Sequence, residues 1–149
     1  MSLVNARIQI DAPIERVWET VMDPDRLGEW VTIHRALVAV SAKPLGKGST
    51  MEQSMHIRGV TFKVSWTLTD VSAPNHAQWE GRGPAHSRAL TRYELSGDKG
   101  GPTTFDYTNE FTTPGGRLGA VAGRVIVGGV SEREAHKSLE RLKSLTERR

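Results

Sequence analysis

The side chains with the clearest chemical pattern alternate along the strand-like segments of the middle of the chain. Aromatic rings and thioethers recur there at every second position, with a few amides and hydroxyls between them. Because successive side chains of a strand point to opposite faces, each alternating set should share one face of a sheet. The sets that we expect to face inward are Met51, Gln53, Met55 and Ile57; Phe62, Val64, Trp66 and Leu68; Trp79; Ala89, Thr91, Tyr93 and Leu95; and Phe105, Tyr107, Asn109 and Phe111. Flat rings and flexible thioethers offer adaptable contact area, so the pattern favours noncovalent binding of a flat or chain-like apolar molecule.

The residues that we expect to contact such a ligand come from this face and from a later helical segment. They are Met55, Phe62, Trp66, Trp79, Tyr93, Tyr107, Asn109, Phe111, Val121 and Val125. The alternative is that the same side chains only fill a core. Inward polar groups would orient a ligand, as apolar pockets commonly need, and the candidates are Tyr93, Tyr107, Asn109, Thr91 and Gln53. A buried amide without a partner costs about 1 to 3 kcal/mol, so Asn109 either serves a ligand, holds a water or ties down a neighbour.

Other kinds of chemistry find little support in the sequence. Cysteine is absent, which excludes disulfides, thiol nucleophiles and thiolate metal sites. The five histidines show no paired metal-ligand spacing, so we expect no metal, and no glycine-rich loop has the context of a cofactor site. Arg82 and His86 lie in a Gly-Pro connection that could reach a ligand carboxylate at a cavity mouth, although a role as exposed turn residues explains them better. Catalytic residues stay unassigned, and whether the protein is an enzyme stays open.

The composition predicts one globular domain over residues 1–149. The chain has 149 residues, 37% hydrophobic and 25% charged, and a formal net charge of +3. Acidic and basic residues alternate throughout, which argues against nucleic acid as a partner. No segment is apolar enough to insert into a membrane and no leader pattern marks the N-terminus, so a cytoplasmic location is expected. A homodimer is compatible with the sequence, which offers no residue to assign to its interface.

The elements that would position these side chains follow from local patterns. Strand-like alternation bounded by glycine, proline and asparagine predicts an antiparallel meander. The expected strands are Leu3–Ile10, Val31–Val40, Gly48–Arg58, Val60–Val71, His76–Gly81, Ala85–Leu95 and Thr103–Thr112. Between the first two, Asp11 should cap a helix that begins at Ala12-Pro13, and a second short helix should run from Asp25 to Glu29.

After Pro114-Gly115-Gly116 the apolar period changes from two to about 3.6, which predicts a long C-terminal helix ending near Leu145. The glycines of its first half, Gly119, Gly123, Gly128 and Gly129, lower its intrinsic helix propensity. Close packing on the sheet must compensate, or the missing side chains leave space for a ligand. The predicted fold class is α+β, with six or seven strands in a curved sheet wrapped around this helix.

Two segments carry a resemblance to a known family. The first, Ile10-Asp11-Ala12-Pro13-Ile14-Glu15-Arg16-Val17-Trp18, continues to Asp23-Pro24 and Trp30; the second, Phe111-Thr112-Thr113-Pro114-Gly115-Gly116, leads into the helix ending Leu139-Glu140-Arg141-Leu142-Lys143. Together they resemble the START and polyketide cyclase/dehydratase superfamily, which includes the birch-pollen-allergen-like proteins. This resemblance covers nearly the whole chain and implies a helix-grip fold. Both segments also have purely structural explanations, as helix start, core and chain break.

The resemblance implies several functions. The leading expectation is a binder of a small hydrophobic molecule, such as a lipid, polyketide or aromatic metabolite, held between the sheet and the C-terminal helix. The alternative is an enzyme like the polyketide cyclases and dehydratases, which would use a tyrosine, arginine or histidine for proton transfer. The inward set is short of ionisable groups other than Tyr93 and Tyr107, which counts against catalysis. A protein-interaction module ranks last, because the outward residues from Thr61 to Thr69 are polar.

Overall fold

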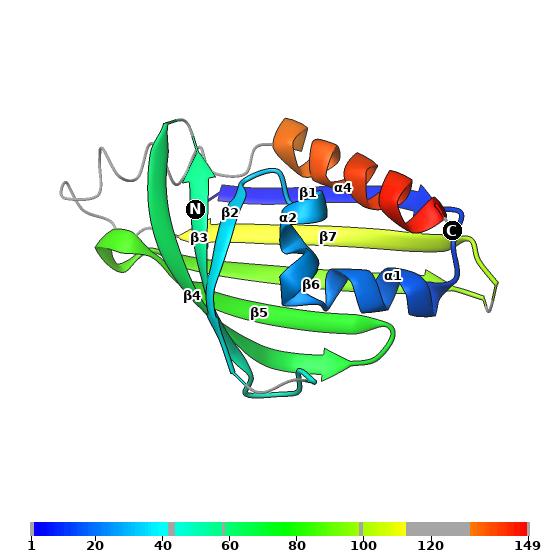
Figure 1. The fold of residues 1–149 in the computed structure, drawn as a ribbon, viewed down its shortest axis with the longest axis horizontal. Helices are drawn as coiled ribbons and strands as arrows, with labels where there is room; N and C mark the ends of the chain where they lie inside the picture. The colour runs from blue at the N-terminus through cyan, green and yellow to red at the C-terminus, as the bar shows by residue number, and fades with distance from the viewer. Residues whose placement is uncertain (1, 42–43, 58, 99, 113–131, 149) are drawn as a thin grey trace.

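One curved antiparallel sheet dominates the computed structural model, which describes residues 2–41, 44–57, 59–98, 100–112 and 132–148 (Figure 1). Its seven strands follow the order β1-β7-β6-β5-β4-β3-β2, so only the pairing of β1 with β7 joins strands distant in sequence. The strands are β1 Ser2–Ile10, β2 His34–Val40, β3 Thr50–Ile57, β4 Val60–Ser72, β5 His76–Arg82, β6 Arg88–Gly97 and β7 Thr103–Thr112. The predicted antiparallel meander is therefore confirmed for β2 to β7, and β1 adds a seventh strand beside β7.

The inward face of the sheet is the one that the alternation predicts. Along β4 the burial alternates residue by residue, with Phe62, Val64, Trp66 and Leu68 buried and the residues between them exposed. Every other member of the predicted inward sets is also buried, except Tyr107, which is half-buried. Because a shift of one residue would turn all of these side chains to solvent, burial of this face fixes the register of the sheet.

The helices lie on the inward side of the sheet (Figure 1). After β1 come α1 Ile14–Val21, the 3-10 turn η1 Pro24–Arg26 and α2 Leu27–Trp30, and the chain ends with α4 Glu132–Glu147. The prediction of two short helices after the first strand is confirmed, but the predicted cap is wrong. Pro13 is the N-cap of α1 and no side chain caps it, whereas the backbone N–H of Asp11 donates to the Glu147 carboxylate. The turn from β1 into α1 is therefore stabilised by a distant helix instead of by a local cap.

Two strand boundaries differ from the sequence prediction. β2 begins at His34, because residues 31–33 form the connection that follows α2. β6 begins at Arg88, because Ala85 and His86 have φ of 57° and 61° in the 3-10 turn η2 Pro84–His86. Such left-handed backbone is incompatible with a strand. The other strand boundaries lie within two residues of the predicted ones.

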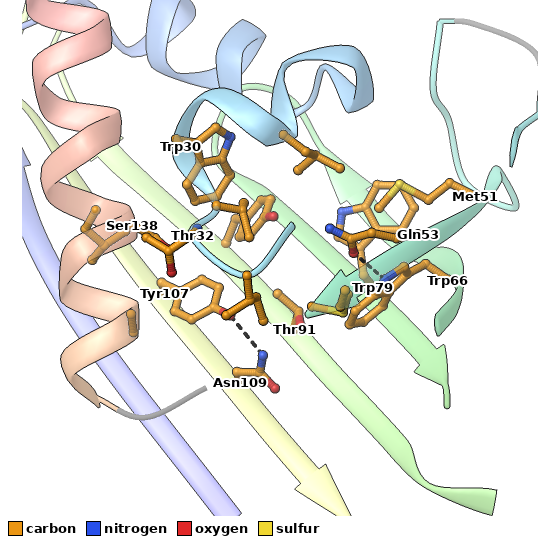
Figure 2. Close-up of a pocket in the computed structure, with 17 residues that line it drawn as sticks. Trp30, Thr32, Met51, Gln53, Trp66, Trp79, Thr91, Tyr107, Asn109 and Ser138 are labelled. Carbon is orange, nitrogen blue, oxygen red and sulfur yellow. Dashed lines mark hydrogen bonds between the residues drawn. The ribbon is translucent and has the colours of Figure 1, made fainter. Parts of the chain in front are cut away.

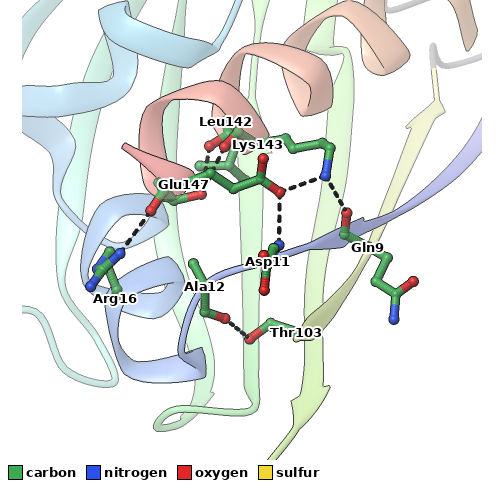
Figure 3. A network of polar contacts seen from close by, with 9 residues as sticks. Gln9, Asp11, Ala12, Arg16, Thr103, Leu142, Lys143 and Glu147 are labelled. Carbon is green, nitrogen blue, oxygen red and sulfur yellow. Dashed lines mark hydrogen bonds and ion pairs between the residues drawn. The ribbon is translucent and has the colours of Figure 1, made fainter. Parts of the chain in front are cut away.

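Helix α4 packs along β1 and is fastened at its C-terminal end to the corner between β1 and α1 (Figure 3). We call this the C-terminal clamp: Lys143 Nζ donates to the Gln9 carbonyl at 3.2 Å, Arg16 Nη1 donates to the Thr146 carbonyl at 3.1 Å, and the Asp11 N–H donates to Glu147 Oε2 at 2.8 Å. The hydrogen bond from Lys143 and the one from the Asp11 backbone hold the pKa of the Glu147 carboxyl below its ordinary value. The clamp holds the last turn of α4 against the corner between β1 and α1.

The predicted first half of the C-terminal helix, including Val121 and Val125, lies outside the described residues. The described part, α4, has 16 residues and presents Ala135, Leu139 and Leu142 to the core at the helical spacing expected from the sequence. Among the described helices, none is long and apolar enough to cross a membrane.

Candidate ligand-binding site

A pocket lies between the inward face of the sheet, α2 and the first turns of α4 (Figure 2). Its walls combine aromatic rings, methionines and a few uncharged polar side chains. The lining residues are Leu27, Trp30, Val31, Thr32, Ile33, Met51, Gln53, Met55, Trp66, Trp79, Thr91, Tyr93, Tyr107, Asn109, Ala135, Ser138 and Leu139. The cavity volume is about 50 Å³, which is room for a few water molecules.

Most of the residues expected to contact a ligand meet at this pocket. Met55, Trp66, Trp79, Tyr93, Tyr107 and Asn109 all line it. Phe62 and Phe111 are buried in the core but are not among the lining residues. Val121 and Val125 lie outside the described residues.

Sequence reasoning missed the wall that faces the sheet. Trp30 is 1% exposed and its ring packs edge-on against Tyr93 and Phe105, with centroids 6.0 and 6.2 Å apart. Ser138 and Ala135 contribute the wall from α4. A helical signal placed Ala135 on the apolar face of that helix, but no local pattern predicts that Trp30 lies over the strands.

One corner of the pocket contains a chain of three paired polar side chains. Trp66 Nε1 donates to Gln53 Oε1 at 2.9 Å, and Gln53 Nε2 lies 2.8 Å from His34 Nδ1. An indole nitrogen can only donate, which directs the amide oxygen of Gln53 towards Trp66 and its NH₂ towards His34. His34 Nδ1 must then accept, so the neutral ring carries its proton on Nε2. We call Gln53, Trp66 and His34 the paired corner.

Protonation of His34 conflicts with this arrangement. A protonated ring would carry hydrogens on both nitrogens and would face the Gln53 NH₂ donor to donor. His34 is also half-buried, and desolvation lowers the pKa of its imidazole. His34 does not line the pocket itself, but it contacts the pocket wall through its partner Gln53.

The two tyrosines of the pocket are poor acids. Burial raises the pKa of the Tyr107 phenol to about 12. Burial, with a smaller effect from Tyr107, raises the pKa of Tyr93 further still. Their rings pack with centroids 6.1 Å apart. At neutral pH both phenols therefore stay protonated, so they can form hydrogen bonds but cannot act as bases.

The opposite side of the pocket, on β6 and β7, holds polar groups without partners. Asn109 Nδ2 donates to Tyr107 Oη at 2.9 Å, which is one of the roles expected for this amide (Figure 2). Within the described residues, Asn109 Oδ1, Thr91 Oγ1 and Trp30 Nε1 have no hydrogen-bond partner although all three atoms are buried. Thr91 and Asn109 are direct partners in the pairing of β6 with β7. We call Thr91 and Asn109 the unpaired corner.

Helix α4 is joined to the connection between α2 and β2 beside the pocket. The Thr32 N–H donates to Ser138 Oγ at 3.1 Å, and Thr32 Oγ1 donates to Glu134 Oε2 at 2.6 Å. These contacts close the pocket between residues 31–33 and α4. Any opening on that side must first break them.

The glycine-proline connection does not reach this pocket. Arg82 and His86 are exposed, and neither is among the lining residues. His76 instead bridges two neighbouring strands on the outer face, with its ring nitrogens 3.1 Å from Asp70 and 2.6 Å from Glu94. In the described part of the chain, no group of three or more histidine, aspartate or glutamate side chains is arranged so that it could hold a metal ion.

Comparisons with known proteins agree with this architecture. Residues 1–147 match the model of a family described as polyketide cyclase / dehydrase and lipid transport. Among solved structures, the ZhuI aromatase/cyclase from Streptomyces sp. R1128 is 19% identical, with 99% of this chain and 94% of that chain covered and a TM-score of 0.73. Protein CV1439 from Chromobacterium violaceum is 15% identical over 100% of both chains, with a TM-score of 0.71.

A curated relative matches only in part. Toxin Rv0910 of Mycobacterium tuberculosis is 26% identical over 83 residues, which are 56% of this chain and 58% of that protein. The match spans little more than half of the relative's length, so it adds nothing about activity. The structural neighbours confirm the helix-grip fold expected from the resemblance. Because the family model matches nearly the full length of the chain, the chain belongs to the polyketide cyclase / dehydrase and lipid transport family.

Proposed function

We propose that this protein binds a small hydrophobic molecule, such as a lipid, a polyketide or an aromatic metabolite, between the sheet and α4. The observation that carries the proposal is the pocket wall: three tryptophans and two tyrosines converge with Met51 and Met55 on one cavity. Rings and thioethers are the side chains that give apolar ligands the largest contact area. The few polar groups among them would orient the ligand.

The cavity must widen to admit such a ligand. Pockets for drug-sized molecules have volumes of roughly 300 to 1,000 Å³, against about 50 Å³ here. Met51 and Met55 are the lining residues best suited to move, because an unbranched thioether adopts many rotamers at little cost. Separation of α4 from residues 31–33 offers a second way to gain volume, and it would have to break the hydrogen bonds of Thr32 to Ser138 and Glu134.

A polyketide cyclase or dehydratase activity is the alternative, and the chemistry of the lining residues favours binding over catalysis. Among the described lining residues, the only ionisable side chains are Tyr93 and Tyr107. Both have raised pKa values, which leaves neither able to accept a proton near neutral pH. A binding role needs no such group.

Native mass spectrometry of the purified protein, compared with its denatured mass, is the first test. A retained apolar compound would support the proposal and identify the ligand class. Titration with the apolar fluorophore Nile red extends the test to protein that purifies without a ligand. A clean native mass together with no Nile red binding would contradict the proposal.

A cavity-filling variant locates the binding. Ala135→Val adds two methyl groups to the α4 wall of the pocket, so it should weaken Nile red binding by about tenfold or more. Ser144→Val is the matched control, because it places the same residue at an exposed position of the same helix. Equal binding by both variants would mean that the fluorophore occupies another site.

We propose further that residues 1–149 act as one ligand-binding domain. Oligomeric state stays a separate prediction: a homodimer would appear in light scattering as twice the mass of 16.4 kDa. Either outcome leaves the ligand proposal intact.

A further inference from the structure

The unpaired corner is the feature of the pocket with the least structural explanation. Thr91 and Asn109 are each 6% exposed, and each carries a buried oxygen with no partner among the described residues. A core that only needed packing would favour valine and leucine at these positions, because unpaired buried polar groups destabilise the fold. The two residues therefore point to a ligand group that pairs with them.

The chemistry of the two side chains limits what that group can be. A threonine hydroxyl both donates and accepts, whereas the free oxygen of the Asn109 amide only accepts. The Asn109 NH₂ is already used by Tyr107 Oη, 2.9 Å away. A ligand that satisfies both residues must donate a hydrogen to Asn109 and also meet the Thr91 hydroxyl.

A single hydroxyl meets both demands. Thr91 and Asn109 are directly opposite across β6 and β7, where Cβ atoms lie about 4.5 to 5.5 Å apart, so one small group can lie between their side chains. If the Asn109 amide turned over, Tyr107 would donate to its oxygen and its NH₂ would be left unpaired. A hydroxyl also accepts, and it would pair with the amide in that orientation as well.

Resting on the proposed function, we propose that the ligand is an apolar molecule with one hydroxyl, an alcohol or a phenol, placed between Thr91 and Asn109. Its apolar body then extends over β5 towards Met51, Met55 and Trp66, where the polar side chains are already paired. An ether or a plain hydrocarbon of the same shape lacks the hydrogen that Asn109 accepts.

The test compares phenol with toluene and anisole, which have similar single rings but differ in hydrogen-bonding capacity. Binding is followed by NMR through the indole N–H signals of the four tryptophans. Trp30, Trp66 and Trp79 line the pocket and report occupancy, while Trp18 is not among the lining residues and serves as an internal control. Phenol should bind about tenfold or more tightly than toluene or anisole, the gain expected when two buried groups become paired.

Variants assign that preference to the corner. Thr91→Val keeps the shape of the side chain and removes the hydroxyl, and Asn109→Leu removes the amide. Because each variant leaves the other residue able to pair with the ligand, each should reduce the preference for phenol over toluene by about threefold or more. Thr67→Val, on the outer face of the same sheet, is the matched control and should keep the full preference. Retained indole chemical-shift dispersion shows that each variant is folded.

The outcomes separate this inference from the proposed function. Equal affinity of phenol and toluene for the wild-type protein would overturn the hydroxyl assignment while supporting an apolar pocket. A phenol preference that is unreduced in both Thr91→Val and Asn109→Leu would place the hydroxyl elsewhere and also overturn it. Absence of any indole shift with phenol, toluene and anisole up to their solubility limits would contradict the binding proposal itself.

Discussion

The two polar corners of the pocket are built from similar residues but differ in how those residues are satisfied. At the paired corner, Trp66, Gln53 and His34 use one another's hydrogen-bonding groups in a single directed chain. At the unpaired corner, Thr91 and Asn109 each keep a buried oxygen without a partner among the described residues. Strand β5 separates the two corners in the sheet.

This difference indicates that the paired corner contributes to stability and the unpaired corner to ligand binding. Satisfied buried polar groups rigidify a core, because breaking any one of their bonds leaves another group unpaired. Unsatisfied buried groups cost about 1 to 3 kcal/mol each, and that energy is recovered when a ligand pairs with them. Substitutions should therefore destabilise the protein at the paired corner, whereas removal of the Thr91 hydroxyl at the unpaired corner should not.

The largest effect is expected from Gly81→Ala, because Gly81 lies directly opposite Trp66 of the paired corner in the pairing of β4 with β5. A Cβ at Gly81 would lie 2.7 Å from Trp66 Cε3 and 2.8 Å from Val64 Cγ1, which is too close for either side chain to remain in place. We expect the free energy of unfolding in urea to fall by about 1 to 3 kcal/mol. Gly46→Ala is the control, since no atom lies within 4 Å of its added Cβ. An unchanged stability of Gly81→Ala would mean that the Trp66 ring is free to move.

Gln53→Leu should be nearly as costly. Leucine fills similar space but leaves the Trp66 indole N–H buried without an acceptor, and the loss expected for such a group is about 1 to 3 kcal/mol. The free energy of unfolding in urea is compared between Gln53→Leu and the double variant Gln53→Leu/Trp66→Phe. Trp66→Phe removes the indole N–H that has lost its acceptor, so we expect the double variant to recover part of the lost stability. If the single variant is as stable as the wild type, the hydrogen bonds of Gln53 to Trp66 and His34 contribute nothing to stability.

Thr91→Val sharpens the comparison from the other corner. Because the hydroxyl has no partner among the described residues, its removal should leave stability unchanged or raise it by up to about 1 kcal/mol in the absence of ligand. Thermal unfolding of the ligand-free protein measures the change. A clear loss of stability would show that the hydroxyl is satisfied in the free protein and that the two corners do not differ in kind.

The smallest effect concerns pH and His34. Burial lowers the pKa of this histidine in the folded protein below its unfolded value, so the unfolded chain binds the proton more readily. The stability from neutral His34 is complete above the unfolded pKa of about 6.5 and is lost as the pH falls towards the lower folded pKa. His34→Leu should remove this part of the pH dependence between pH 7 and 5, whereas His136→Leu, at an exposed position on α4, should keep it. The NMR signal of the Trp66 indole N–H should also shift with pH in the wild type. A signal that does not move would show that His34 is not coupled to Trp66 through Gln53.

The sheet was predictable from the sequence because its information is local. Alternation over segments such as Val60–Ser72 determines which side chains face inward, and the structure confirms those sets. The capping of α1 was not predictable, because the partner of the Asp11 N–H is Glu147, which lies at the far end of the sequence.

The candidate site was predictable as a set of residues but not as two corners. Alternation predicts that Gln53, Thr91 and Asn109 point inward, yet which of them are paired depends on strand register and on tertiary neighbours. His34 lies on another strand from its partner, and Trp30 reaches the pocket from a short helix. No spacing within a single element encodes these contacts.

The C-terminal clamp holds α4 at the end that is remote from the pocket, so a tilt of the helix would turn around that end. The clamp holds residues 143–147, while the pocket touches Ala135, Ser138 and Leu139 near the other end of the helix. At 1.5 Å per residue, Ala135 lies about 18 Å from Glu147 along the helix axis. A tilt of about 5° around the clamp would therefore move Ala135 by about 1.6 Å, roughly the length of one C–C bond. Side chains at the corner of β1 and α1, which never meet the ligand, would in this way set how wide the pocket opens.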